Sequence, residues 1–123
     1  MYSELIPVDI VVVDPSHYLR SKMMIEALDL LAPEVQPIIE RRQWDLTTPE
    51  GVRAYGAFGV HVVPTICVDM HRCFENRIPT VDELYLALAT MARTDEQREI
   101  ITRAWAKGTA DYTPVRPKIA HAA

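Results

Sequence analysis

Glycine is scarce in this chain of 123 residues, which contains only four glycines. No glycine-rich loop that could cradle a phosphate is present, so the sequence gives no support for nucleotide binding. Positive charge is also scarce, because 13 lysines and arginines stand against 17 aspartates and glutamates, for a net charge of −4. Without a basic patch, we expect no nucleic-acid partner.

Long apolar runs are missing as well. The stretch MYSELIPVDIVVVD at the N-terminus has no basic flank and only a short apolar run. It therefore predicts neither a signal peptide nor a membrane-spanning helix, and we expect a cytoplasmic protein with no membrane contact. The share of hydrophobic residues, 49%, and of charged residues, 24%, is typical of a soluble globular protein.

Cysteine is limited to Cys67 and Cys73. In a reducing compartment their expected state is two free thiols. If the hairpin loop between them has three residues, the two cysteines face each other, but at a separation that would strain a disulfide. If the loop has two residues, they lie on opposite faces of the sheet and cannot bridge. We favour two buried, inert thiols, and a redox switch remains the alternative.

A metal site built on the same hairpin is disfavoured by its spacing. Cys67, His71 and Cys73, with His61 nearby, supply sulfur and nitrogen ligands. Their spacing does not match the short cysteine pairs of structural zinc sites, and strand alternation scatters the side chains. We therefore expect no metal and no other cofactor.

The apolar pattern in the first half of the chain predicts alternating strands and helices. Residues 8–13, VDIVVV, are typical of a strand buried on both faces. Ser16 is placed to cap a following amphipathic helix that ends before Pro33. Residues 35–39, VQPII, predict a second short strand, which Pro37 favours at an edge of the sheet.

The second half predicts a helix, a hairpin and another helix. Thr48, followed by a proline, is typical of a helix start, and this helix is expected to end near Gly59. Residues 60–76 have the pattern of a β-hairpin. Thr80, with a glutamate three residues later, predicts a capping box at the start of the next helix. The fold class is therefore α/β, with the order β-α-β-α-β-β-α around a mixed sheet.

Beyond this unit, the chain continues into an extension. We assign residues 1–92 to the domain and residues 93–108 to an added C-terminal helix, anchored by Trp105 and closed by Gly108. Residues 109–123 lack apolar periodicity and are expected to form an extended or disordered tail. Trp44, which follows the second predicted strand, is expected to pack at the core or its rim.

Pro64 stands inside a segment that otherwise favours a strand, residues 59–69, GVHVVPTICVD. A proline has no N–H for a strand ladder, so its place at the start of a buried strand makes sense if its peptide bond is cis. The segment resembles the G-V-x-x-V-P-T motif of the thioredoxin superfamily. Residues 74–80, FENRIPT, resemble the hairpin exit and last-helix start of that family, and the likeness extends over residues 7–92.

The resemblance implies a small thioredoxin-like domain in which Pro64 is the cis-proline. It also implies that Val63 offers main-chain groups to an extended partner. In redox members of the family, a C-x-x-C motif stands between the first strand and the first helix. Here Ser16 and Leu19 take the places of the two cysteines. Standard thiol–disulfide exchange is therefore not expected, because that chemistry needs a thiolate.

Polar residues stand at the predicted start of the first helix, where redox members of the family carry the C-x-x-C motif. Ser16, His17 and Tyr18, together with Val63 and Pro64, are the candidate partner-binding residues. The leading hypothesis is a redox-inactive, non-catalytic protein-binding or adaptor module whose partner docks an extended segment at Val63 and Pro64; a homodimer is a further possibility. The alternative is an atypical redox protein that uses the two cysteines of the hairpin.

Overall fold

The computed structural model describes residues 4–112. Its centre is a mixed, open sheet of four strands in the order β2-β1-β3-β4. β1 (Ile6–Val12) pairs in parallel with β2 (Ile39–Asp45) and antiparallel with β3 (Thr65–Val68), and β4 (His71–Glu75) pairs antiparallel with β3. The predicted α/β class, the mixed sheet and the order of elements are confirmed.

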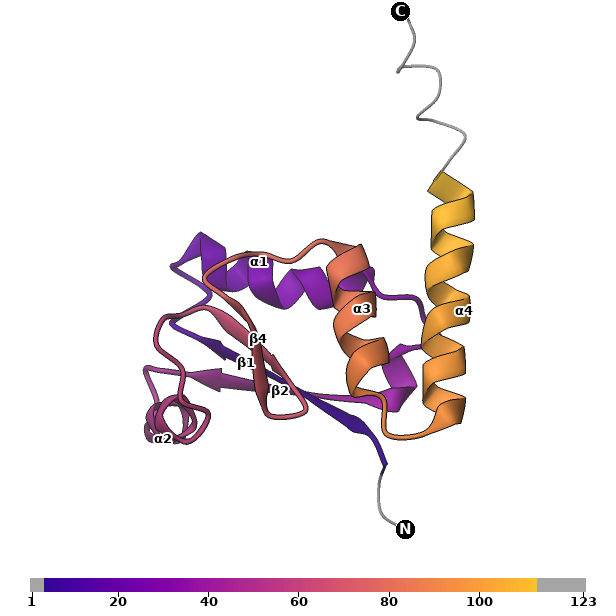
Figure 1. The fold of residues 1–123 in the computed structure, drawn as a ribbon. Helices are drawn as coiled ribbons and strands as arrows, with labels where there is room; N and C mark the ends of the chain where they lie inside the picture. The colour runs from indigo at the N-terminus through magenta and orange to yellow at the C-terminus, as the bar shows by residue number, and fades with distance from the viewer. Residues whose placement is uncertain (1–3, 113–123) are drawn as a thin grey trace, which may run out of the picture.

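The helices cover the two faces of the sheet unequally (Figure 1). On one face, α1 (Leu19–Ala27), α3 (Val81–Met91) and α4 (Asp95–Tyr112) pack against the even-numbered side chains of β1, from Ile6 to Val12. On the other face, α2 (Pro49–Ala57) covers a smaller cluster built on Val11, Val60 and Cys67. β1 is buried along its whole length because helices lie over both of its faces.

Two of the predicted helix starts are confirmed. The Thr48 hydroxyl accepts a hydrogen bond from the Gly51 N–H at 3.0 Å, with Pro49 in the first turn of α2. At α3, Thr80 and Glu83 form the predicted capping box. Such local signals depend on only a few consecutive residues, which explains why they can be recognised in the sequence.

The start of the first helix was predicted wrongly. α1 begins at Leu19, after Tyr18, and no side chain caps it. Ser16 instead donates its hydroxyl proton to Asp14, and the main chain turns tightly here, since the N–H groups of His17 and Tyr18 both bind the Asp14 carbonyl. Asp14 itself adopts a positive φ of 35°. Because the Ser16 hydroxyl is engaged with the Asp14 side chain, it does not cap α1.

The second strand was also placed wrongly. Residues 36–38 form one turn of 3₁₀ helix, and the strand begins at Ile39, so β2 is the polar segment IERRQWD. The second strand does lie at an edge of the sheet as expected, but it is formed by residues 39–45 instead of residues 35–39. Proline at position 37 fits a turn better than a strand. Polar residues are tolerated in β2 because one edge of the strand faces away from the sheet.

The C-terminal helix continues beyond its predicted end. α4 runs to Tyr112 through Gly108, so residues 109–112 of the predicted tail are helical, and residues 113–123 lie outside the described part of the chain. An exposed glycine inside a helix costs only about 1 kcal/mol, and favourable packing elsewhere outweighs it. Trp105 anchors α4 as expected: its ring stacks on Tyr85 of α3, and its N–H binds Asp82 at 2.9 Å. In residues 4–112 no helix is long and apolar enough to cross a membrane.

Candidate functional site

The loop before β3 and the start of α1 meet at one end of the sheet. The β1–β3 ladder ends with Val11 opposite Thr65, and Pro64 directly precedes β3. The Val63–Pro64 peptide bond is cis. Pro64 therefore lies at the same end of the sheet as the turn that contains Ser16 and His17, although it is far from that turn in the sequence.

A chain of hydrogen bonds links the first turn of α1 to Pro64. Arg20 donates to both the carbonyl and the side-chain oxygen of Asn76, at 3.1 and 2.7 Å. The N–H of Asn76 in turn binds the Pro64 carbonyl at 2.7 Å. The sequence analysis did not single out Arg20 or Asn76 as a pair, because they meet only when the chain returns from β4 beside the start of α1.

The loop from Gly59 to Pro64 is tied down at nearly every residue. Tyr55 donates to the His61 carbonyl, Glu75 accepts from the His61 N–H, and Thr65 binds the Val62 carbonyl. The Gly59 carbonyl accepts from Arg72. In the hydrogen bonds among residues 4–112, the main chain of Val63 takes no part. A fixed loop therefore presents one half-buried residue whose N–H and C=O remain available.

Exposed apolar side chains also stand at the start of α1. Tyr18 and Leu19, at the start of α1, are 56% and 68% exposed. An exposed leucine at the first position of a helix adds no burial free energy to folding, since its side chain remains in water. The polar members of the predicted site are equally accessible, because Ser16 and His17 are both exposed. The structure brings Ser16, His17 and Tyr18 together in one turn, at the end of the sheet where Pro64 leads into β3.

The geometry of the polar turn does not support nucleophilic catalysis. His17 Nδ1 lies 2.6 Å from Asp14 Oδ2 and 3.2 Å from the Ser16 hydroxyl, so one ring nitrogen faces both partners. A catalytic relay needs the carboxylate and the hydroxyl on opposite ring nitrogens. The hydrogen bond from Ser16, followed by the bond and charge of His17, lowers the pKa of Asp14. Asp14 is therefore an anionic acceptor at neutral pH and holds this turn closed.

Asp45 joins the turn to the start of α2. Its Oδ1 accepts from the N–H groups of Asp14 and Thr47, both at 3.0 Å, and from the Thr47 hydroxyl. The main-chain bonds from Thr47 and Asp14 lower the pKa of Asp45. The carboxyl ends of β1 and β2 thus carry two anionic side chains. Within the described residues, no group of three or more acidic, histidine or cysteine side chains could hold a metal ion.

The two cysteines are on opposite faces of the sheet. The hairpin loop has two residues, Asp69 and Met70, and Cys67 lies opposite Arg72. Cys67 is fully buried in the cluster under α2, whereas Cys73 packs against the cluster under α1 and α3. Of the two geometries considered, the two-residue loop is observed, and a disulfide is excluded because the side chains diverge. Burial raises the pKa of Cys67 to about 12 and also raises that of Cys73.

This arrangement predicts that neither thiol responds to a physiological redox buffer. In a titration of the full chain against glutathione, read by intact mass after alkylation, we expect no loss of two protons at any ratio. Cys67 should become alkylated at pH 8 only in denaturant, because both burial and its raised pKa suppress the thiolate. A reversible two-proton loss that disappears in Cys67→Ser would contradict this prediction and favour the redox alternative.

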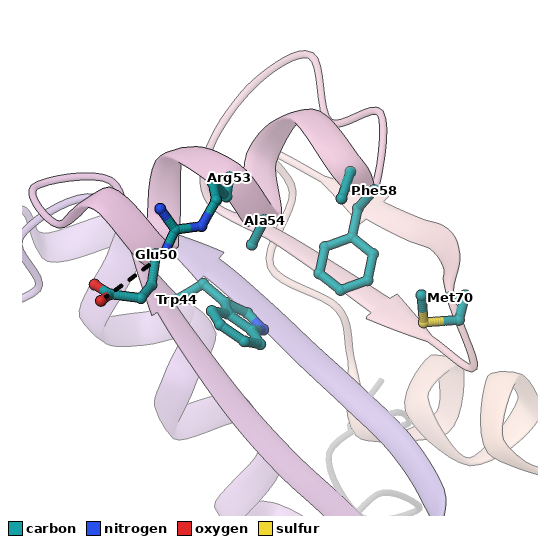
Figure 2. A pocket seen from close by; sticks show the side chains of 7 residues that line it. Trp44, Glu50, Arg53, Ala54, Phe58 and Met70 are labelled. Carbon is teal, nitrogen blue, oxygen red and sulfur yellow. Dashed lines mark ion pairs between the residues drawn. The ribbon is translucent and has the colours of Figure 1, made fainter.

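A concave feature lies on the α2 face (Figure 2), where Val63, Trp44 and Phe58 pack against the same small cluster. This groove of about 300 Å³ is lined by Trp44, Ala54, Ala57, Phe58 and Met70, with Glu50 and Arg53 at one end. Trp44 was expected to pack at the core or its rim, and it forms the floor of this groove. Met70 reaches the groove from the hairpin turn, where it has a positive φ of 72°.

The orientation of Trp44 depends on a buried charge in the central strand. Its indole N–H donates to Asp9 Oδ1 at 2.8 Å, and Arg42 holds both oxygens of the same carboxylate, at 2.7 and 2.8 Å. Asp9 is completely buried. The sequence analysis did not single out Asp9, although an aspartate within a run of valines and isoleucines is a recognisable exception.

Comparison with known proteins does not assign the chain to a family. No family model, curated protein or solved structure matches this chain.

Proposed function

We propose that the chain is a thioredoxin-like, non-catalytic module that binds an extended segment of a partner protein at Val63 and Pro64. The observation that carries the proposal is the unused main-chain N–H and C=O of Val63 in a loop whose other residues are held by hydrogen bonds. An extended peptide pairs through such groups and gains specificity from neighbouring side chains. The strand order and the placement of the helices are compatible with a thioredoxin-like fold.

The neighbouring side chains favour an apolar anchor on the partner. Tyr18 and Leu19 supply exposed apolar surface at the start of α1. His17 and Asp14 bind each other and add a polar border. The serine and leucine at the positions of the family's two cysteines cannot exchange disulfides, so binding does not lead to thiol chemistry.

The proposal predicts a specific loss of binding in Leu19→Asp. Peptides selected from a displayed random library on the immobilised full chain should bind this variant at least about tenfold more weakly, because the apolar contact is replaced by a charge. Its free energy of unfolding should stay within about 0.5 kcal/mol of the wild type, since Leu19 is exposed. Fluorescence anisotropy of labelled peptides and urea titration measure the two effects.

Leu86→Asp is the matched control. Leu86 is a similarly exposed leucine, 57% accessible, on α3. Selected peptides should bind this variant with wild-type affinity. The proposed function is wrong if the peptides bind Leu19→Asp as tightly as the wild type, or if both aspartate variants weaken binding equally.

A further inference from the structure

One side of α2 forms a wall of the groove on the α2 face (Figure 2). Its residues recur at the spacing i, i+3, i+4, i+7 and i+8, so they lie in one stripe along the helix. At the start of α2, Gly51 lies so close to the Asp45 main chain that no room for a Cβ remains. Farther along, two alanines keep the helix surface low and leave a space of about 300 Å³. The stripe consists of Glu50, Arg53, Ala54, Ala57 and Phe58.

Trp44 forms the floor of the groove, and its hydrogen-bonding capacity is already used. Its indole N–H binds the buried Asp9 carboxylate at 2.8 Å, and Arg42 holds the same carboxylate. The indole therefore offers the groove an apolar ring and no free donor. An aromatic ring that is fixed in this way favours a flat aromatic neighbour.

Met70 closes the end of the groove opposite Glu50. Asp69 and Met70 both have a positive φ, of 50° and 72°, in a two-residue turn that commonly has glycine at its second position. Other contacts hold this turn, because the Asp69 carboxylate accepts from Arg93 at 2.7 Å and the Asp69 N–H binds the Pro7 carbonyl at 2.8 Å. Met70 is 55% exposed and gains little from burial. An exposed apolar side chain in this unfavourable backbone conformation indicates a role in binding.

We propose that the groove binds an uncharged aromatic molecule of two fused rings. Its volume of about 300 Å³ is roughly twice that of a cavity that holds one benzene molecule, about 150 Å³. The charged groups of Glu50 and Arg53 stand 3.9 Å apart at one end, so their charges offset each other and favour a ligand without net charge. Apolar walls with a few polar groups at one place are typical of small-molecule sites.

A free molecule suits the groove better than a peptide segment. The groove is walled by side chains (Figure 2), whereas an extended peptide pairs through main-chain groups. Val63, whose main chain the proposed function uses, packs against the neighbouring cluster but is not among the residues that line the groove. The groove is therefore a second site, with a ligand of its own.

The test is the binding of 2-naphthol to the full chain, followed by NMR at the Trp44 indole N–H and the Met70 methyl group. Both signals should shift and reach saturation as the concentration rises. Phenol, which has one ring, should bind at least about tenfold more weakly because it buries less apolar surface. Naphthalene-2,6-disulfonate should also bind at least about tenfold more weakly, because one sulfonate would have to enter the apolar part of the groove.

A matched pair of tryptophan variants tests the location of the site. Ala57→Trp should fill the groove and lower the affinity for 2-naphthol at least about tenfold. Val52→Trp is the control, because Val52 is also exposed on α2 but does not line the groove. This control should bind 2-naphthol like the wild type. Both positions are exposed, so both variants should fold.

Met70→Asn separates a binding role of Met70 from a structural one. Asparagine adopts a positive φ more readily than methionine, so the variant should unfold at a higher urea concentration than the wild type. It should nevertheless bind 2-naphthol at least about threefold more weakly, because the apolar wall is lost. A lower urea midpoint with unchanged affinity would show that Met70 serves folding, which contradicts the proposal.

Three further results would overturn the proposal. The first is that 2-naphthol shifts neither signal, or binds both tryptophan variants equally. The second is a wild-type dimer in sedimentation equilibrium that Ala57→Trp dissociates, which would assign the groove to a second copy of the chain. The third is that the peptides selected for the Val63 site bind Ala57→Trp more weakly than the wild type, which would assign the groove to the partner protein.

Discussion

Gly51→Ala should lower the free energy of unfolding by about 3 kcal/mol, one of the two largest effects expected in this chain. A Cβ on Gly51 would stand 1.8 Å from the Asp45 carbonyl oxygen and 2.3 Å from its carbon. Both atoms belong to the main chain, which cannot move aside as a flexible side chain can. The first turn of α2 would have to retreat from the end of β2. Urea unfolding of the wild type and the variant measures the change.

Gly56→Ala is the matched control on the same helix. Apart from its chain neighbours and the backbone of α2 itself, no atom lies within 4 Å of a Cβ built at Gly56. Alanine there should raise the free energy of unfolding by about 0.5 to 1 kcal/mol, because it restricts the unfolded chain and favours the helix. Similar losses in both variants would contradict the prediction, because Gly56 has no contact of this kind and the loss at Gly51 could not then be assigned to Asp45. Because Asp45 also binds the N–H of Asp14, movement at Gly51 is expected to disturb the turn that carries His17.

Arg42→Met should cost about 3 kcal/mol of unfolding free energy. Asp9 is fully buried, and Arg42 supplies two of the three side-chain donors that hold it. Removing one partner of a buried ion pair leaves a desolvated charge without compensation. Urea titration gives the loss, and Trp44 fluorescence should shift because its hydrogen-bond acceptor changes environment.

Replacing both members of the pair should be less harmful than replacing Arg42 alone. Asp9→Val/Arg42→Met removes the buried charge together with its partner and leaves only the Trp44 N–H without an acceptor. We expect the double variant to be more stable than Arg42→Met, which gives a positive coupling energy in a double-mutant cycle. Additive losses would show that the two side chains do not act as a pair.

The asymmetry of the two sheet faces explains where the candidate surfaces lie. Three helices cover one face, whereas α2 alone covers the other. The half-covered face retains the groove floored by Trp44, which needs Asp9 and Arg42 to satisfy its N–H. At the end of the sheet, the main chain of Val63 takes no part in the hydrogen bonds among residues 4–112.

The order of elements and several boundaries could be predicted because their signals are local. A run of buried valines, a threonine before a proline and a threonine three residues before a glutamate each act through neighbouring residues. The errors arose where a local preference competes with tertiary contacts. Ser16 can cap a helix, but its hydroxyl binds Asp14. The segment ERRQWD lacks a strand pattern, yet β1 aligns it and Asp9 accepts its arginine and tryptophan donors.

The sequence by itself determined the α/β class, the succession of strands and helices, and the absence of a cysteine pair at the start of the first helix. Each of these depends on residue type and spacing along the chain. Only the tertiary structure decided that Cys67 and Cys73 face opposite sides, because a two-residue turn fixes the register of the hairpin. It also decided that Arg20 reaches Asn76 and that Val63 keeps its main-chain groups free, since those contacts join segments distant in the sequence.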